Sequence, residues 1–243
     1  MDRIVLDQKV DIGKEVVIKG PPLEALCFQG GRVGSLVTLT DSEGSDFRGR
    51  VTRLSGMEGF ILIFEAFPSP TESSLEINLL QALPEKERME LIIQKTTELG
   101  VSTILPFQSE RSISLKEREA KQKKAHRWQY VAVKAVQQSR RAKMPYIGEC
   151  RPFQEVLGDA SEGGLKILLW EKGGENLKSV LRQHPTRKIS VMVGPEGGFT
   201  GEEVKLAKKK GFIPVKLGQR ILRTETAAVT IVGILQYELG DLN

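Results

Sequence analysis

Hydrophobic and polar positions follow different patterns in the two parts of this chain. Up to about residue 68, short alternating or β-branched runs are separated by glycine-containing turns. These runs cover residues 15–20, 35–41, 48–54 and 59–67. Alternation with a period of two residues is typical of half-buried strands. The first part is therefore predicted to be a small β-barrel.

From residue 75 onward, short apolar runs alternate with longer helical patterns. The predicted strands cover residues 75–83, 101–107, 165–170, 189–194 and 212–217. Such alternation favours the α/β class, with a mostly parallel sheet covered by helices. The proline- and serine-rich stretch PSPTESS, residues 68–74, is the best linker candidate. We therefore expect one domain over residues 1–70 and a second over residues 75–243.

Two helices are predicted early in the second part. In the first, residues 84–100, Pro84 suits the first turn and Gly100 ends the helix. Its apolar face consists of Met89, Ile92, Ile93, Thr96 and Leu99. The second, residues 116–141, has an apolar stripe formed by Trp128, Ala132, Ala135 and Val136. Both stripes have helical spacing, so they are expected to face the core.

Composition narrows the class of protein. The chain has 243 residues, of which 40% are hydrophobic and 28% charged, as in ordinary globular proteins. No apolar stretch approaches the roughly 18 residues that a membrane span needs, and the first residues do not resemble a signal peptide. We therefore expect a cytoplasmic protein with no membrane partner. Two isolated histidines and two distant cysteines argue against a metal site and a Ser-His-Asp triad.

Positive charge is concentrated in one segment. Residues 1–74 hold 8 Lys and Arg against 11 Asp and Glu, whereas residues 108–148 hold 11 Lys and Arg against 3 Glu. A concentrated basic stretch attracts RNA or DNA through phosphate contacts. The alternative is a solvated helix whose lysines only confer solubility.

The stretch VGPEGGFTGEEV, residues 193–204, joins a buried strand to a helix through a glycine turn. Thr200 and Glu203 have the spacing of a capping box, and Gly211 is expected to close the helix. Glycines let backbone amides approach a ligand closely. The two common phosphate-binding signatures are absent, so the ligand need not be a phosphate. The alternative is a tight connection without a ligand.

A second loop, LGQRILRTETAA at residues 217–228, also follows a predicted strand. Loops at the carboxyl ends of parallel strands meet at one edge of the sheet, so both loops are expected to line one crevice. Ile221 and Leu222 form either a wall for an aromatic ring or simple packing under neighbouring residues. The last helix is apolar on nearly every side, which predicts burial in the sheet or in a subunit contact.

Four motifs together resemble one family. They are EINLLQALPEKERMELIIQKTTELGVSTILPFQSERS, WQYVAVKAVQQSRRAKMP, VGPEGGFTGEEV and LGQRILRTETAA. Over residues 75 to 240 the chain resembles the ribosomal RNA small subunit methyltransferase E (RsmE) family of the SPOUT superfamily. Residues 1–70 fit that family's PUA-like β-barrel in length and pattern, but lack its usual histidine pair and V-L-R.

The resemblance implies a fold, a reaction and a cofactor. The fold is a C-terminal SPOUT domain whose parallel sheet contains a deep trefoil knot, in a homodimer. The reaction is N3-methylation of one uridine in 16S small-subunit ribosomal RNA, either free or in the assembled 30S subunit. The cofactor is S-adenosylmethionine, which carries no phosphate. The implied cofactor-binding residues are Leu169, Gly194, Glu196, Gly198, Leu217, Gly218, Ile221, Leu222, Thr226 and Ala227.

Candidate catalytic residues lie beside the second loop. N3 of uridine is protonated at neutral pH, so Arg223 is predicted to stabilise the developing anion and Glu225 to accept the proton. The alternative is that these two residues pair with each other or cap the last helix. Arg111, Arg140 and Arg141 are candidates for contact with RNA phosphates. Rival functions are a noncatalytic RNA-binding protein and a SPOUT methyltransferase with another RNA target or position.

Overall fold

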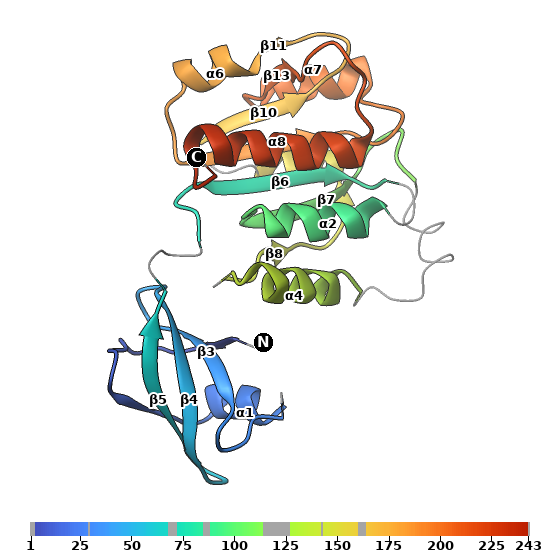
Figure 1. Ribbon diagram of the computed structural model, residues 1–243. Helices are drawn as coiled ribbons and strands as arrows, with labels where there is room; N and C mark the ends of the chain where they lie inside the picture. Colours follow the sequence, from blue (N-terminus) through green and yellow to red (C-terminus); the bar gives the residue numbers. More distant parts are fainter. Residues whose placement is uncertain are drawn as a thin grey trace. The chain divides into compact units, whose positions relative to one another are not determined.

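The computed structural model describes residues 3–28, 30–67, 72–84, 88–113, 127–141, 143–159 and 164–242. The chain divides into two compact units (Figure 1). The first consists of Met1–Glu72 and Val136–Lys143, and the second of Ser73–Ala135 and Met144–Asn243. No helix in the described ranges is both long and apolar enough to cross a membrane.

The first unit is built on a five-stranded sheet in the order β1-β3-β4-β5-β2. Its strands are β1 (Arg3–Val5), β2 (Glu15–Ile18), β3 (Leu36–Thr40), β4 (Asp46–Leu54) and β5 (Gly59–Ala66). Three of the four predicted runs contain the strands β2, β3 and β5, and the fourth, residues 48–54, covers all of β4 except its first two residues. The sequence pattern did not predict α1 (Pro21–Phe28). This helix begins with two prolines, which suit a first helical turn, and its Leu23 and Leu26 are buried in the core.

The second unit contains an eight-stranded sheet in the order β11-β13-β10-β12-β6-β7-β8, with β9 also paired to β7. The strands are β6 (Glu76–Ala82), β7 (Thr103–Gln108), β8 (Tyr146–Ile147), β9 (Arg151–Pro152), β10 (Leu165–Leu169), β11 (Glu175–Asn176), β12 (Lys188–Val193) and β13 (Ile213–Lys216). Every pairing in this sheet is parallel. The predicted α/β class with a parallel sheet is therefore confirmed.

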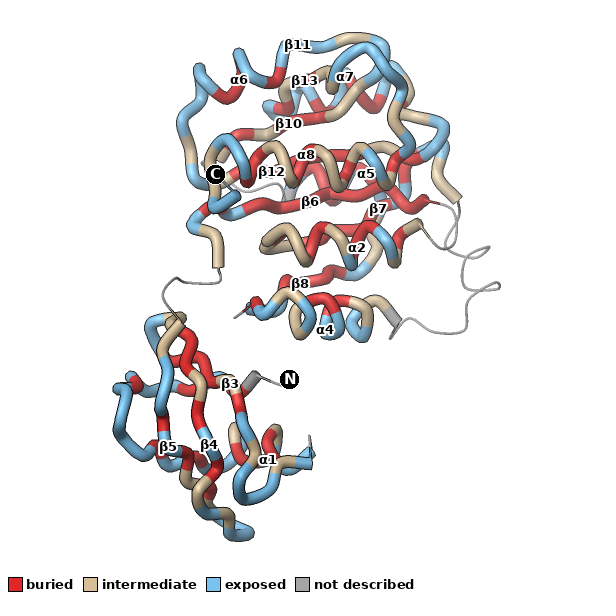
Figure 2. The backbone as a smooth tube through the Cα atoms, viewed as in Figure 1, coloured by how far each residue is buried: buried red, intermediate tan, exposed pale blue. Residues whose placement is uncertain are grey.

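Helices cover both faces of this sheet. They are α2 (Arg88–Glu98), α4 (Arg127–Ser139), α5 (Phe153–Asp159), α6 (Leu177–Gln183), α7 (Gly201–Lys209) and α8 (Thr224–Leu239). Apolar residues of α2, α4, α6 and α8 share one core cluster, and those of α5 and α7 share another. Most of β6 is buried (Figure 2). Its neighbouring residues Leu79 and Leu80 belong to these two different clusters. The sheet therefore separates two cores.

Both helices predicted early in the second part are present. Met89, Ile92, Ile93 and Thr96 are buried on α2, and Gly100 follows the helix with φ +86°. Residues 85–87 at the predicted start lie outside the described ranges. Ala132 and Ala135 are buried on α4. That helix is described from Arg127, so the predicted portion over residues 116–126 also lies outside the described residues.

The last helix, α8, is only partly as predicted. One face is buried, through Ala228, Ile231, Val232 and Leu235. This face packs against α2, β6 and β12. The opposite face is open, since Thr226 is exposed and Tyr237 is 61% exposed. The helix is therefore a covering layer of the sheet, and its apolar sequence does not bury it on every side within this chain.

Candidate functional site

A cavity of about 430 Å³ lies at the carboxyl ends of β10, β12 and β13. It brings together the two loops that were predicted to share a crevice. Nine of the ten predicted cofactor residues line it: Leu169, Gly194, Glu196, Gly198, Leu217, Gly218, Ile221, Leu222 and Ala227. Position at adjacent strand ends explains why residues so far apart in the chain meet here.

The tenth residue, Thr226, lies elsewhere. It is exposed on α8 and lines a neighbouring groove of about 570 Å³ between α6 and α8. Thr224 has the place near the loops that was expected of Thr226. Its hydroxyl donates to the carbonyl of Gly194 at 2.6 Å and accepts from Gln81 Nε2 at 3.0 Å. One buried hydroxyl thus connects β6, the first loop and the start of α8.

Two positions of the first loop favour glycine. Gly198 has φ +66°, and a Cβ there would lie 3.0 Å from Glu171 Oε1. A Cβ at Gly194 would lie 3.1 Å from the ring of Phe199. That ring stacks on Phe107 with centroids 6.3 Å apart. The loop therefore lies in close contact with the Phe199 ring at Gly194 and with the Glu171 carboxylate at Gly198.

The predicted capping box is present at the start of α7 and has a further function. Thr200 accepts from the Glu203 backbone, and the Glu203 carboxylate accepts from the Thr200 backbone N–H at 2.9 Å. The same carboxylate is buried and accepts from Ser109 Oγ at 2.8 Å and from the Glu110 N–H at 3.0 Å. Glu203 therefore joins the first loop to the segment that follows β7.

The three candidate RNA contacts have different surroundings. Arg111 is exposed and donates to the carbonyl of Gly197 at 3.0 Å, so it also supports the first loop. Arg140 is exposed and has φ +58°. Arg141 is only 5% exposed and forms an ion pair with Glu72 at 2.9 Å within the first unit. Burial and pairing leave Arg141 poorly placed for a phosphate, whereas Arg140 is accessible.

The candidate catalytic residues do not contact each other within the described part of the chain. Arg223 is exposed, lines the cavity and makes no side-chain cap for α8. Glu225 is 14% exposed, and its Oε2 lies 3.8 Å from Arg88 Nε. Arg88 also donates from Nη1 to Glu196 Oε1 at 2.7 Å. The sequence reading missed Arg88 because α2 carried only a packing signal.

The cavity wall combines apolar and charged groups. Leu169, Leu217, Leu222 and Ala227 supply apolar surface, and Glu171 and Glu196 supply carboxylates. Arg88, Lys216, Arg220 and Arg223 supply positive charge. Such a wall suits a ligand with a flat apolar ring and charged groups, and the volume lies in the usual range for small-molecule sites. Among the described residues, no three His, Cys, Asp or Glu side chains gather to hold a metal ion.

Comparison with known sequences identifies the family. Residues 71–236 match the model of the RNA methyltransferase domain. A ribosomal RNA small subunit methyltransferase E from Aquifex aeolicus is 34% identical over 226 residues, covering 84% of this chain and 95% of the relative. Its counterpart from Buchnera aphidicola is 34% identical over 181 residues, covering 74% of this chain and 71% of the relative.

Solved structures agree with the sequence comparison. A crystal structure of a ribosomal RNA small subunit methyltransferase E from Neisseria gonorrhoeae, bound to S-adenosylmethionine, is 32% identical with a TM-score of 0.77 and full coverage of both chains. A Legionella pneumophila protein in complex with the cofactor S-adenosylmethionine is 31% identical with a TM-score of 0.72, covering 99% of this chain and 98% of that one. This chain belongs to the ribosomal RNA small subunit methyltransferase E family.

Proposed function

We propose that this protein transfers a methyl group from S-adenosylmethionine to N3 of one uridine in 16S small-subunit ribosomal RNA. The observation that carries the proposal is the cavity at the strand ends, where nine expected cofactor residues meet. The two solved structures that share this fold over nearly the whole chain hold S-adenosylmethionine, and the Neisseria structure and the Aquifex relative are both named ribosomal RNA small subunit methyltransferase E. The substrate is free RNA or the assembled 30S subunit.

The residues present fit this cofactor. The apolar side chains of Leu169, Leu217 and Leu222 suit the adenine ring, and glycines at 194, 198 and 218 leave backbone groups accessible to the ring edge. The carboxylates of Glu171 and Glu196 suit the ammonium group. When bound, S-adenosylmethionine supplies a methyl group activated by a positively charged sulfur.

The protein itself must accept the N3 proton of the uridine and stabilise the negative charge that develops on the uridine oxygens. Arg223 is exposed at the cavity wall, where its guanidinium can face the oxygens of a uridine that is losing its N3 proton. We assign the proton to Glu225, the carboxylate in the first turn of α8. The base has to be unstacked from its neighbours to reach such a cavity.

The finer organisation of the molecule follows the same family. We propose that residues 1–70 form a PUA-like barrel and that residues 75–243 form the SPOUT methyltransferase domain, in which the two loops are part of a trefoil knot. The antiparallel pairings around β4 and β5 and the parallel sheet of the second unit support this assignment. We also propose a homodimer. Exposed Arg111 and Arg140 support contact with RNA.

Calorimetry with S-adenosylmethionine tests the proposal. Leu222→Arg places a charge against the apolar wall, and we expect a cofactor affinity at least ~30-fold weaker than that of the parent, about 2 kcal/mol. Leu206→Arg on the outer side of α7, where Leu206 is 38% exposed, is the matched control. A folded parent that binds no cofactor would contradict the proposal.

The product must then be identified. Parent protein, cofactor and undermethylated 30S subunits or 16S RNA are incubated, and the nucleosides are separated by mass spectrometry against standards. We expect 3-methyluridine at a single position, abolished by Leu222→Arg. A methyl group on another base or on a ribose would instead support the rival methyltransferase, and RNA binding without methylation would support the noncatalytic protein.

A further inference from the structure

Arg88 lies between two carboxylates, one in the cavity wall and one beside the cavity in the first turn of α8. Its Nη1 donates a hydrogen bond of 2.7 Å to Oε1 of Glu196, in the first loop. Its Nε lies 3.8 Å from Oε2 of Glu225, in the first turn of α8. One guanidinium at the start of α2 therefore connects the first loop with the first turn of α8.

The carboxylate of Glu225 depends on this neighbour. Its Oε2 is buried and accepts no hydrogen bond from any residue that the structure describes. A buried carboxylate oxygen needs a nearby positive charge or a donor to offset the loss of water. Among the described residues, Arg88 is the cation with which Glu225 forms an ion pair. The charge beside the cavity is thus held by a residue outside both loops.

The shape of the guanidinium matters for this arrangement. Arginine presents five N–H donors in a rigid planar fork, so it can face two carboxylates at once. Lysine presents one compact ammonium and can hold one of them well. The side chains of Arg88 and Glu196 are 32% and 29% exposed, so the ion pair between them is partly shielded from solvent. The ion pair between Arg88 and Glu225 is shielded more, because the Glu225 side chain is only 14% exposed.

We propose that Arg88 is a positioning residue with two separable effects on the site. Through Glu196 it fixes the first loop and so supports cofactor binding. Through Glu225 it holds the carboxylate that takes part in proton transfer and so supports turnover. This inference rests on the proposed methyltransferase function.

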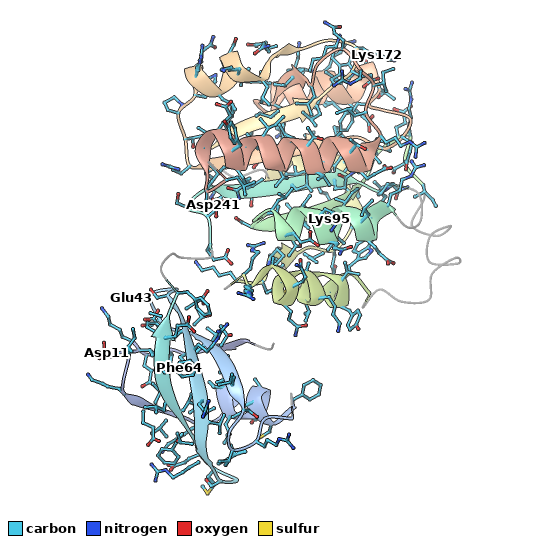
Figure 3. All side chains as sticks on the ribbon, in the orientation of Figure 1. Asp11, Glu43, Phe64, Lys95, Lys172 and Asp241 are labelled. Atoms are coloured by element: carbon cyan, nitrogen blue, oxygen red, sulfur yellow. The ribbon has the colours of Figure 1, made fainter. Side chains whose placement is uncertain are left out.

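The test compares Arg88→Gln and Arg88→Lys with a control substitution of Lys95, which lies on the same helix (Figure 3). The control, Lys95→Gln, removes an ion pair with Glu98. For Arg88→Gln we expect kcat to fall ~10- to 100-fold and the cofactor Kd to rise ~3- to 10-fold. Arg88→Lys is expected to restore Kd to within ~3-fold of the parent but to leave kcat at least ~5-fold low. Thermal melting of each variant confirms that it is folded.

Double-mutant cycles separate positioning from a general loss of structure. We expect Glu196→Gln to raise Kd and Glu225→Gln to lower kcat. Each is expected to have a smaller effect in the Arg88→Gln background than in the parent, because its interaction with Arg88 is already lost there and only its own direct role remains. The Glu196 side chain is 29% exposed, so we expect Glu196→Gln to fold. Its cofactor Kd can therefore be measured even if Arg88→Gln does not fold.

The outcomes distinguish this inference from the proposed function. If the parent methylates RNA while Arg88→Gln keeps Kd and kcat within ~2-fold, the inference fails and the function stands. Additive effects in both cycles would also overturn the inference, because they show that Arg88 acts independently of the two carboxylates. If the parent neither binds cofactor nor methylates RNA, the proposed function fails and the inference falls with it.

Discussion

Thr224 donates a hydrogen bond of 2.6 Å to the carbonyl of Gly194, a residue that lies 30 positions earlier in the chain. The same hydroxyl oxygen accepts from the side chain of Gln81 on β6. The position of the first loop relative to α8 is therefore set by a hydroxyl that is itself oriented by the central sheet. Because Gly194 lines the cavity, this contact controls the shape of the site.

Thr224→Val is expected to destabilise the protein and weaken cofactor binding. Valine keeps the shape of threonine, but it leaves the Gly194 carbonyl and the Gln81 amide each without one partner. An unsatisfied buried polar group costs about 1–3 kcal/mol. Urea unfolding measures the loss of stability, and calorimetry measures cofactor affinity. Thr224→Ser, which keeps the hydroxyl, is expected to stay close to the parent in affinity; equal losses in both variants would refute this account.

Gly198→Ala is expected to lower both stability and cofactor affinity. The residue has φ +66°, and an added Cβ would lie 3.0 Å from Glu171 Oε1. Left-handed backbone disfavours alanine by roughly 1–2 kcal/mol. Gly201→Ala is the control, because no atom lies within 4 Å of its added Cβ, and alanine favours the first turn of α7. Similar melting temperatures for the two variants would contradict the prediction.

Glu203→Gln is expected to loosen the contact between the first loop and residues 109–112. The amide keeps one acceptor but directs an NH₂ group at backbone and hydroxyl donors that now face a carboxylate. We expect a loss of about 2–3 kcal/mol in the free energy of unfolding. Glu202→Gln, whose exposed side chain pairs with Lys205, is expected to change it by less than about 0.5 kcal/mol. Hydrogen exchange at the amide of Glu110 provides a local readout.

Arg140 and Arg141 are adjacent, yet their substitution is expected to affect different properties. Arg141→Gln removes the partner of Glu72, which is 15% exposed, and is expected to cost about 3 kcal/mol of stability. Arg140→Gln is expected to leave stability within about 0.5 kcal/mol. It should weaken RNA binding and lower the slope of log affinity against log salt by about one. An unchanged salt slope would remove Arg140 from the set of phosphate contacts.

Much of the second unit was predictable because its strands are continuous apolar runs with clear helix signals between them. Buried strands such as β6 and β12 read the same way in the sequence and in the structure. The capping box of Thr200 and Glu203 was also predictable, because it depends only on residues three positions apart. Two-residue strands such as β8 and β11 were missed, since they are defined by their partners and not by their own residues.

The site was predictable where a loop follows a strand and not where contacts come from elsewhere. Arg88 and Glu171 are ordinary surface residues in sequence, and only the fold brings them to the cavity. Thr224 and Thr226 both occur in the same motif, but a difference of two helix positions directs one toward Gly194 and the other toward solvent. A motif alone does not show which side of a helix will face the sheet and which will face solvent.

The order of strands in the parallel sheet has a consequence for the synthesis of the protein. β6 pairs with β12, and Ile77 lies opposite Ile189 in this pairing. The ribosome adds Ile189 more than one hundred residues after Ile77. Until then, the apolar side of β6 that faces β12 has no partner strand. Pairings between such distant segments form slowly. During that interval a nascent chain exposes a hydrophobic strand edge, to which a chaperone can bind.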